Sequence, residues 1–451
     1  MKQVFAHIDE HLDESLEVLK DLCRLPSVSA RGQAIEETAE HVVGLLRKLG
    51  FETRVLAKPA GGHPVVYAEA SGASPRTLLF YDHYDVQPEE PLELWSSPPF
   101  EPTLKKDKVY GRGVSDNKGN IVARLAAIRA WREAGGGLPC GVKFCVEGDE
   151  EIGSPHMEEF VGEHKALLAA DACVWEGGGV TWDGLPQVTL GVKGLLYVQL
   201  DCEAIDHDAH SSYGTVLPNA AWRLVWALAS IKGPDERVNI DGFYEAVRPP
   251  TSEERAAIEA MPREDEETLK SYGIEDAVLG IRGLEYRLRH YLEPTATVDG
   301  LSAGYEGEGA KTVLPARAMA KLDFRLVPEQ DPEDILAKLR RHLGVHGFAD
   351  VRVTYVSGER PARTPVTDPF VVVMRAAVRE AYGAEPIIVP TMAGTGPLYP
   401  FVKTLGLPTA DCGIGYPGAR IHAPDENIRI EDFRRGTRAI ASLLGRFGSE
   451  G

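Results

Sequence analysis

Positive charge is in short supply in this sequence. Its 49 Lys and Arg residues face 68 Asp and Glu residues, which leaves a formal net charge of −19 over 451 residues. Nucleic acids and anionic membranes are bound by basic surfaces, so this balance argues against both as partners. The acidic composition fits an enzyme that acts on small molecules, but it does not indicate which ones.

Cysteines and long apolar runs are also scarce. The six cysteines form no C-x-x-C pair, and a chain of this length needs no disulfides to hold its core. We therefore expect reduced, mostly buried thiols in a cytoplasmic protein. No apolar run approaches the roughly 20 residues that span a bilayer. The N-terminal segment has the spacing of an amphipathic helix rather than the apolar core of a signal peptide.

The chain lacks internal repeats, and its length allows two or three domains of about 150 residues each. Up to residue 192, strand-like apolar runs alternate with helical patterns, which is typical of an α/β domain with a central, mostly parallel sheet. The pattern becomes α+β from Lys193 and changes back after a Pro-containing linker near residue 362. We predict an α/β domain of residues 1–192 and 363–451, interrupted by an inserted α+β domain of residues 193–362.

One predicted strand, within residues 77–86, ends in His83 and Asp85. Side chains two apart on a strand point to the same face, and open α/β sheets place their sites at such strand ends. Imidazole is the commonest metal ligand, and a nearby carboxylate can fix its tautomer. The alternative is an ordinary strand end whose polar residues reach water.

Further carboxylates follow other predicted strands. Asp116 lies between glycine-containing turns just before a helix, where it could instead be a helix cap. Glu150 and Glu151 follow an apolar strand, although an acidic run is often only a solvated loop. Glu176 ends another strand, and His422 lies near the C-terminal end of the chain.

Two histidines and three or four carboxylates exceed the four ligands that one zinc ion usually takes. They suit a pair of divalent ions bridged by one carboxylate and a water, which together clamp a hydroxide and polarise a carbonyl. Such chemistry also needs a free carboxylate as general base. The doublet Glu150-Glu151 can supply one ligand and one base.

The order of these motifs resembles that of a known metallopeptidase family. The family contains carnosine-type dipeptidases, aminoacylase, acetylornithine deacetylase, succinyl-diaminopimelate desuccinylase and glutamate carboxypeptidase. Each motif alone is weak, but together they are highly specific. The matching motifs are His83-x-Asp85, Gly113-Val-Ser-Asp116-x-Lys-Gly119, Glu150-Glu151-Ile-Gly153, Glu176 and His422.

The resemblance implies two divalent metal ions, zinc first, with manganese or cobalt as alternatives. Asp116 would bridge them, His83 and Glu176 would complete one site, and Glu151 and His422 the other. The family often has Asp in place of Glu176, and both bind metal.

The resemblance also implies roles for residues that bind no metal. Glu150 would be the general base, and Asp85 would orient a ligand. The peptide bond after Asp116 would be cis.

The inserted domain resembles the family's lid, or dimerisation, domain, which implies a homodimer. In relatives, the histidine that corresponds to His210 reaches the partner subunit's active site, where it would stabilise the oxyanion. Arg325 and Thr312 would hold the free carboxylate of the substrate, because a guanidinium binds a carboxylate bidentately. Thr395 would contact the same end of the substrate. The alternatives are a polar strand end for His210 and a structural salt bridge for Arg325.

The resemblance implies metal-dependent hydrolysis of the amide bond of dipeptides. The alternative inside the family is an N-acyl-amino-acid deacylase or desuccinylase. The chain length, the long inserted domain and the segments around Thr312 and Arg325 resemble the dipeptidases more closely.

Two other functional classes fit the sequence less well. A phosphate loop at residues 304–312 is disfavoured because Ala310 separates the second glycine from Lys311. A binding protein that has lost catalysis is disfavoured because every expected ligand and the base are present.

Overall fold

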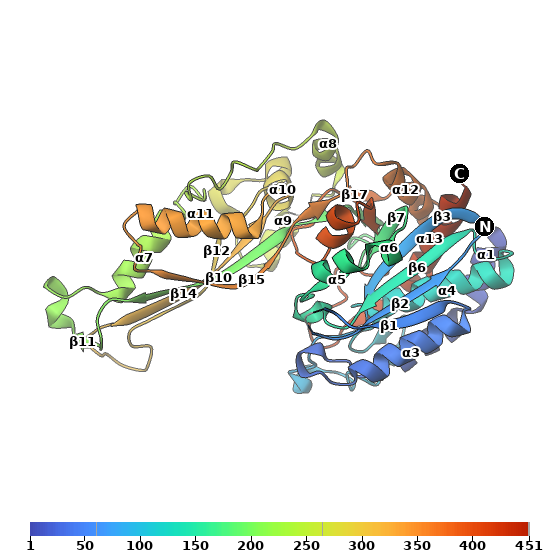
Figure 1. Ribbon diagram of the computed structural model, residues 1–451, viewed down its shortest axis with the longest axis horizontal. Helices are drawn as coiled ribbons and strands as arrows, with labels where there is room; N and C mark the ends of the chain where they lie inside the picture. Colours follow the sequence, from blue (N-terminus) through green and yellow to red (C-terminus); the bar gives the residue numbers. More distant parts are fainter. Residues whose placement is uncertain (60, 264, 450–451) are drawn as a thin grey trace. The chain divides into compact units, whose positions relative to one another are not determined.

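The computed structural model describes residues 1–59, 61–263 and 265–449. The chain divides into two compact units (Figure 1). The first unit comprises Met1–Gly191, Arg363–Pro390 and Pro397–Gly451, and the second comprises Val192–Ala362 and Thr391–Gly396. The short strands β9 (Gly191–Val192) and β16 (Ala362–Arg363) lie where the chain passes from one unit to the other.

The first unit is built on a six-stranded sheet with the order β1-β2-β6-β3-β7-β18 (Figure 1). Strand β3 pairs parallel with β6 and β7, and β7 pairs parallel with β18, whereas β1 and β2 run antiparallel. The predicted α/β class with a mostly parallel central sheet is therefore confirmed. The strands are β1 (Glu52–Leu56), β2 (Val65–Ala70), β3 (Ser74–His83), β6 (Cys140–Glu147), β7 (Ala172–Trp175) and β18 (Thr409–Asp411).

Helices cover this sheet, and α4 and α13 both contact β3. The sequence predicts a single N-terminal helix, and this prediction is wrong in one respect. The chain forms two helices, because the backbone of His11 leaves the helical conformation. Buried residues keep a helical spacing on both sides of the break, so the apolar pattern does not reveal it. The helices are α1 (Lys2–Glu10), α2 (Leu12–Cys23), α3 (Ile35–Lys48), α4 (Lys118–Ala134), α5 (Met157–Glu163), α6 (Lys165–Leu168), α12 (Pro369–Tyr382) and α13 (Ile430–Ser449).

A small antiparallel sheet joins distant parts of the first unit. Its strands are β4 (Thr103–Lys105), β5 (Lys108–Tyr110) and β19 (Asn427–Arg429), in the order β19-β5-β4. Asn427 pairs with Tyr110, so the segment before β19 meets the loop that follows β5. Strands β8 (Gln187–Thr189) and β17 (Ile387–Val389) form a separate parallel pair.

The second unit has a four-stranded antiparallel sheet in the order β12-β14-β10-β15, with α7 and α11 packed on it (Figure 1). Alternate residues of β10 are buried, as expected for a strand with one face on a core. The elements are β10 (Gly194–Glu203), β11 (Ala209–His210), β12 (Thr297–Ala303), β13 (Val313–Leu314), β14 (Arg317–Leu326), β15 (Arg352–Glu359), α7 (Ala220–Ile231), α8 (Ser252–Ala260), α9 (Asp265–Ser271), α10 (Gly283–Leu292) and α11 (Pro332–Val345).

All six cysteines lie in the described part of the chain, where each is buried and unpaired, as predicted. Among the residues that the structure describes, no helix has both the length and the apolar character needed to cross a membrane.

Candidate metal centre

The metal centre that the sequence predicts begins at the end of β3. His83 is the last residue of that strand and is buried. Because β3 runs parallel to β6 and β7, with His83 opposite Glu147, the residues that follow all three strands meet at one edge of the sheet. Glu150 and Glu151 follow β6, and Glu176 follows β7.

Asp116 lies between the two predicted histidine ligands. Its Oδ1 is 3.1 Å from Nε2 of His83, and its Oδ2 is 3.0 Å from Nε2 of His422. Each oxygen of one carboxylate thus faces a different imidazole, which is the arrangement that a carboxylate bridging two cations requires. The peptide bond between Asp116 and Asn117 is cis, as the resemblance implied.

The remaining carboxylates complete the two sides. On the first side, Nε2 of His83 lies 3.5 Å from Oε2 of Glu176 and 3.8 Å from Oε2 of Glu150. On the second side, Nε2 of His422 lies 3.0 Å from Oε2 of Glu151. The structure therefore brings together all five predicted ligands and the predicted base.

The carboxylates of this cluster gather negative charge in a buried site, which favours the binding of cations. Burial and the neighbouring carboxylates raise the pKa of Glu150 and of Glu176 well above the usual range. Hydrogen bonds to Asp116 and Glu151 raise the pKa of His422 to about 10. At these raised pKa values, protons offset the negative charge of the carboxylates. Divalent metal ions that bound to the same groups would displace those protons.

An orphaned atom supports the same conclusion. Oε2 of Glu176 is buried and has no hydrogen-bond partner among the described residues. Within this centre, two groups of three residues have ligand atoms within 4.8 Å of one another: His83 with Asp116 and Glu151, and His83 with Glu150 and Glu176. A set of imidazole and carboxylate donors with an unmet lone pair fits divalent ions.

Asp85 holds two parts of the centre in place. Nδ1 of His83, on the side of the ring away from Asp116, lies 3.1 Å from the backbone carbonyl oxygen of Asp85 and 3.4 Å from its Oδ1. The same buried carboxylate accepts hydrogen bonds from the backbone N–H groups of Glu150 (3.3 Å) and Glu151 (3.0 Å). It therefore orients an imidazole and the loop that carries the two glutamates.

The role of Glu426 was not predicted from the sequence. This fully buried carboxylate accepts hydrogen bonds from the backbone N–H groups of Gly113 (3.0 Å), Ser115 (2.9 Å) and Asp116 (3.0 Å). It also accepts one from Nη1 of Arg112 at 2.8 Å. Glu426 thus positions the loop that carries Asp116, and only the pairing of β19 with β5 reveals this.

Gln87 was also missed. Its side-chain amide donates to Oε2 of Glu151 at 3.0 Å and to the carbonyl oxygen of Glu151 at 2.9 Å. A signal was available, because positions 83, 85 and 87 alternate and share one face of an extended chain.

The comparison with family models gives the same answer as the geometry. The model of peptidase family M20/M25/M40 matches residues 79–446, which is most of the chain. The chain belongs to this family. The resemblance that the motifs indicated is thereby confirmed, and membership in this metallopeptidase family implies divalent metal ions at the centre described above.

Similar proteins include a metallo-carboxypeptidase and dipeptidases. A solved M20 family metallo-carboxypeptidase from Sulfolobus solfataricus is 38% identical, with a TM-score of 0.90, over 97% of this chain and 99% of that one. The Beta-Ala-His dipeptidase of Rattus norvegicus is 27% identical over 98% of this chain and 95% of its own length. The Cys-Gly metallodipeptidase of Schizosaccharomyces pombe is 28% identical over 76% of this chain and 75% of its own.

The second unit of this M20 peptidase holds the other predicted residues, in two pairs. Oγ1 of Thr312 lies 3.4 Å from Nε2 of His210. Nη1 of Arg325 donates to Oγ1 of Thr395 at 2.7 Å, and its Nε donates to Oδ2 of Asp323 at 3.0 Å. The salt bridge named above as the alternative for Arg325 is therefore present.

Proposed function

We propose that this peptidase is a metal-dependent dipeptidase that uses two divalent ions, zinc first. The observation that carries the proposal is the position of Asp116, with one oxygen toward His83 and the other toward His422. The dipeptidase names of the similar proteins support the choice of substrate.

The proposed ligand sets follow the distances around Asp116. Asp116 would bridge the two ions, His83 and Glu176 would complete one site, and Glu151 and His422 would complete the other. Manganese or cobalt would suit the same donors. Asp85 and Glu426 hold the ligands in position but bind no ion.

Glu150 is the proposed general base. When bound, the two ions lower the pKa of a water and polarise the scissile carbonyl. Glu150 takes the proton of the attacking water and passes it to the leaving amine. A carboxylate at this position can hold the proton between the two transfers.

His210 is proposed to donate a hydrogen bond to the substrate's oxyanion. Its Nδ1 accepts a hydrogen bond from the backbone N–H of Ser212 at 3.1 Å. A neutral imidazole that accepts at Nδ1 carries its proton at Nε2 and presents a donor there. His210 is exposed, and we propose that it acts in the active site of the partner subunit of a homodimer.

Replacing His210 by alanine is expected to lower kcat by about 10²–10³-fold, the usual effect of losing one oxyanion donor. Metal content, measured by elemental analysis, should stay the same because His210 binds no ion. His207→Ala is the matched control, since His207 is exposed and lies three residues away. An unchanged kcat in His210→Ala would assign this histidine to structure alone.

The proposed dimer contact is an apolar surface on α7 and the preceding turn. Val216, Trp222 and Trp226 are each more than half exposed, and the two tryptophan rings stack with centroids 5.9 Å apart. Exposed aromatic residues that cluster in this way mark interaction surfaces. A second copy of the chain is the proposed partner.

Trp226→Glu is expected to convert the dimer to a monomer, because the new charge would have to be buried in the interface. Analytical ultracentrifugation would measure the mass, and kcat should fall with it because His210 then lacks a partner active site. Trp182→Glu is the control, since this tryptophan lies in the first unit and is also more than half exposed. A wild-type monomer, or a dimeric Trp226→Glu variant, would contradict the proposal.

Arg325 is the proposed anchor for the substrate's free carboxylate, with Thr312 and Thr395 beside the same end of the substrate. Arg325→Lys should raise KM for dipeptides by about 10–100-fold, because an ammonium cannot bind a carboxylate bidentately. The kcat should change less. Arg317→Lys, on the exposed face of the same strand, is the control. Equal KM values in the two variants would remove Arg325 from this role.

A second candidate is a metallo-carboxypeptidase that removes single residues from longer peptides. It is favoured by the 38% identical relative of that name. An anchor for a free carboxylate such as Arg325 would serve either activity. The deacylase alternative uses the same centre on an acylated amino acid.

A hydrolysis panel on the metal-reconstituted protein would separate these activities. It would compare unblocked dipeptides, peptides of four to six residues, and N-acetyl and N-succinyl amino acids, each with and without chelator. Cleavage of dipeptides that chelator abolishes supports the dipeptidase. Preference for the longer peptides or for the acylated substrates would replace it with the corresponding alternative.

Six buried, unpaired thiols support a reducing, cytoplasmic location as part of the proposal.

A further inference from the structure

A second cluster of metal-type ligands lies in the second unit, outside the centre described above. His342 on α11 and His346, at the end of that helix, are four residues apart and share one face. Their ring centroids are 4.1 Å apart. Asp241, in the turn that follows β-bridged Val238, completes the cluster, and one ligand atom from each residue lies within 4.8 Å of the others.

His342 contains a buried nitrogen with an unmet lone pair. The side chain is 1% exposed, and its Nε2 lies 3.1 Å from the carbonyl oxygen of Ser230. A carbonyl oxygen only accepts, so Nε2 carries the proton and Nδ1 presents its lone pair. Nδ1 is buried and has no hydrogen-bond partner among the described residues. Leaving such an atom unsatisfied is costly, so its environment calls for an explanation.

The surroundings of His342 suit a metal ligand. Histidines that bind metals usually donate their other N–H to a backbone carbonyl or a carboxylate, which fixes the tautomer and the ring orientation. Ser230 provides that carbonyl.

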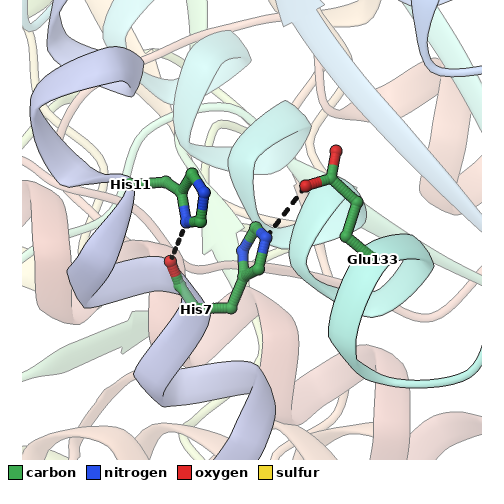
Figure 2. Close-up of side chains that lie close together, drawn as sticks. All are labelled: His7, His11 and Glu133. Atoms are coloured by element: carbon green, nitrogen blue, oxygen red, sulfur yellow. Dashed lines mark hydrogen bonds and ion pairs between the residues drawn. The ribbon is translucent and has the colours of Figure 1, made fainter.

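A similar set of residues shows why the residue types alone are not enough. His7 and His11 are also four apart, and both lie near Glu133 (Figure 2). There, Nε2 of His7 is 2.9 Å from Oε2 of Glu133, and Nδ1 of His11 is 3.0 Å from the carbonyl oxygen of His7. Neither ring has a buried nitrogen without a partner among the described residues. These contacts account for that group without an ion.

We propose that Asp241, His342 and His346 bind one divalent transition-metal ion of the zinc, cobalt or nickel type. Nδ1 of His342 is the preformed ligand, and the exposed His346 and Asp241 move the short way needed to reach ligand distance. Three protein ligands leave one tetrahedral position for water. The ion would tie the end of α11 to the turn that carries Asp241, which makes it a structural site.

Cobalt binding to the full-length protein tests the proposal. Equilibrium dialysis against Co²⁺, with elemental analysis, should give one equivalent fewer in His346→Ala and in Asp241→Ala than in the wild type. The absorption of tetrahedral Co²⁺ should fall by the corresponding share, and the rise in Tm on adding the last equivalent should disappear. Both substituted residues are exposed, so the variants should fold.

The control is His11→Ala, which removes the corresponding residue of the similar cluster and should bind as much Co²⁺ as the wild type. The comparison depends on the difference between variants, so it does not require the catalytic centre to hold two ions. Wild-type stoichiometry in both His346→Ala and Asp241→Ala would overturn the proposal. Loss of the equivalent in His11→Ala alone would assign the ion to the other cluster.

Discussion

Glu150→Gln is expected to lower kcat for dipeptides by about 10²–10⁴-fold while both metal ions stay bound. The amide keeps the size of the side chain but cannot take a proton from water. Initial-rate measurements at saturating dipeptide would give kcat, and elemental analysis of the same sample would give the metal content. The carboxylate lies 3.8 Å from Nε2 of His83, close to the ligands without being required by the proposed ligand sets.

The neighbouring Glu151→Gln supplies the contrast. Glu151 is a proposed ligand, with Oε2 3.0 Å from Nε2 of His422, so its loss should lower metal content together with activity. If Glu150→Gln instead lost an ion, Glu150 would be a ligand, as its grouping with His83 and Glu176 permits. Full activity with both ions bound would remove Glu150 from catalysis.

Glu426→Gln should destabilise the protein and weaken metal binding together. The carboxylate accepts three backbone N–H bonds and pairs with Arg112 in a fully buried environment. The glutamine side chain is uncharged, and its NH2 group would face the N–H groups that now donate to the carboxylate. Breaking a buried ion pair typically costs about 3–5 kcal/mol of stability. Urea unfolding of the metal-free protein would measure the stability, and metal titration would measure the affinity.

The control for this change is Glu431→Gln. Glu431 pairs with Arg434 and Arg435 at the surface, where such a change costs about 1 kcal/mol or less. If Glu426→Gln were no more destabilising than Glu431→Gln, the buried contacts would not position the Asp116 loop. Lower stability with unchanged metal affinity would separate the two effects and confine Glu426 to folding.

Much of the centre could be predicted because its residues follow apolar strands. A parallel sheet places the carboxyl ends of neighbouring strands at one edge, so residues after β3, β6 and β7 must meet. This is why His83, Glu150 and Glu176 were found from local patterns. Asp116 and His422 needed the order of the family's motifs, since neither directly follows a strand of that sheet.

Glu426 and Gln87 show where local patterns are insufficient. From the sequence alone, an acidic residue near a chain end is expected to be exposed to solvent. Glu426 is buried because Asn427 pairs with Tyr110, a contact between residues more than 300 positions apart. The break at His11 was missed for the opposite reason, since the apolar spacing continues through it.

The sequence by itself determined the α/β class, the inserted α+β segment and the chemical types of the site residues. Those features depend on hydrophobic periodicity and on side-chain chemistry, both of which are local. Only the tertiary structure decided that Asp116 presents one oxygen to each histidine and that Glu426 holds its loop. It also showed the unpartnered Nδ1 of His342. Distances, burial and unmet lone pairs depend on how distant segments pack, which no local pattern encodes.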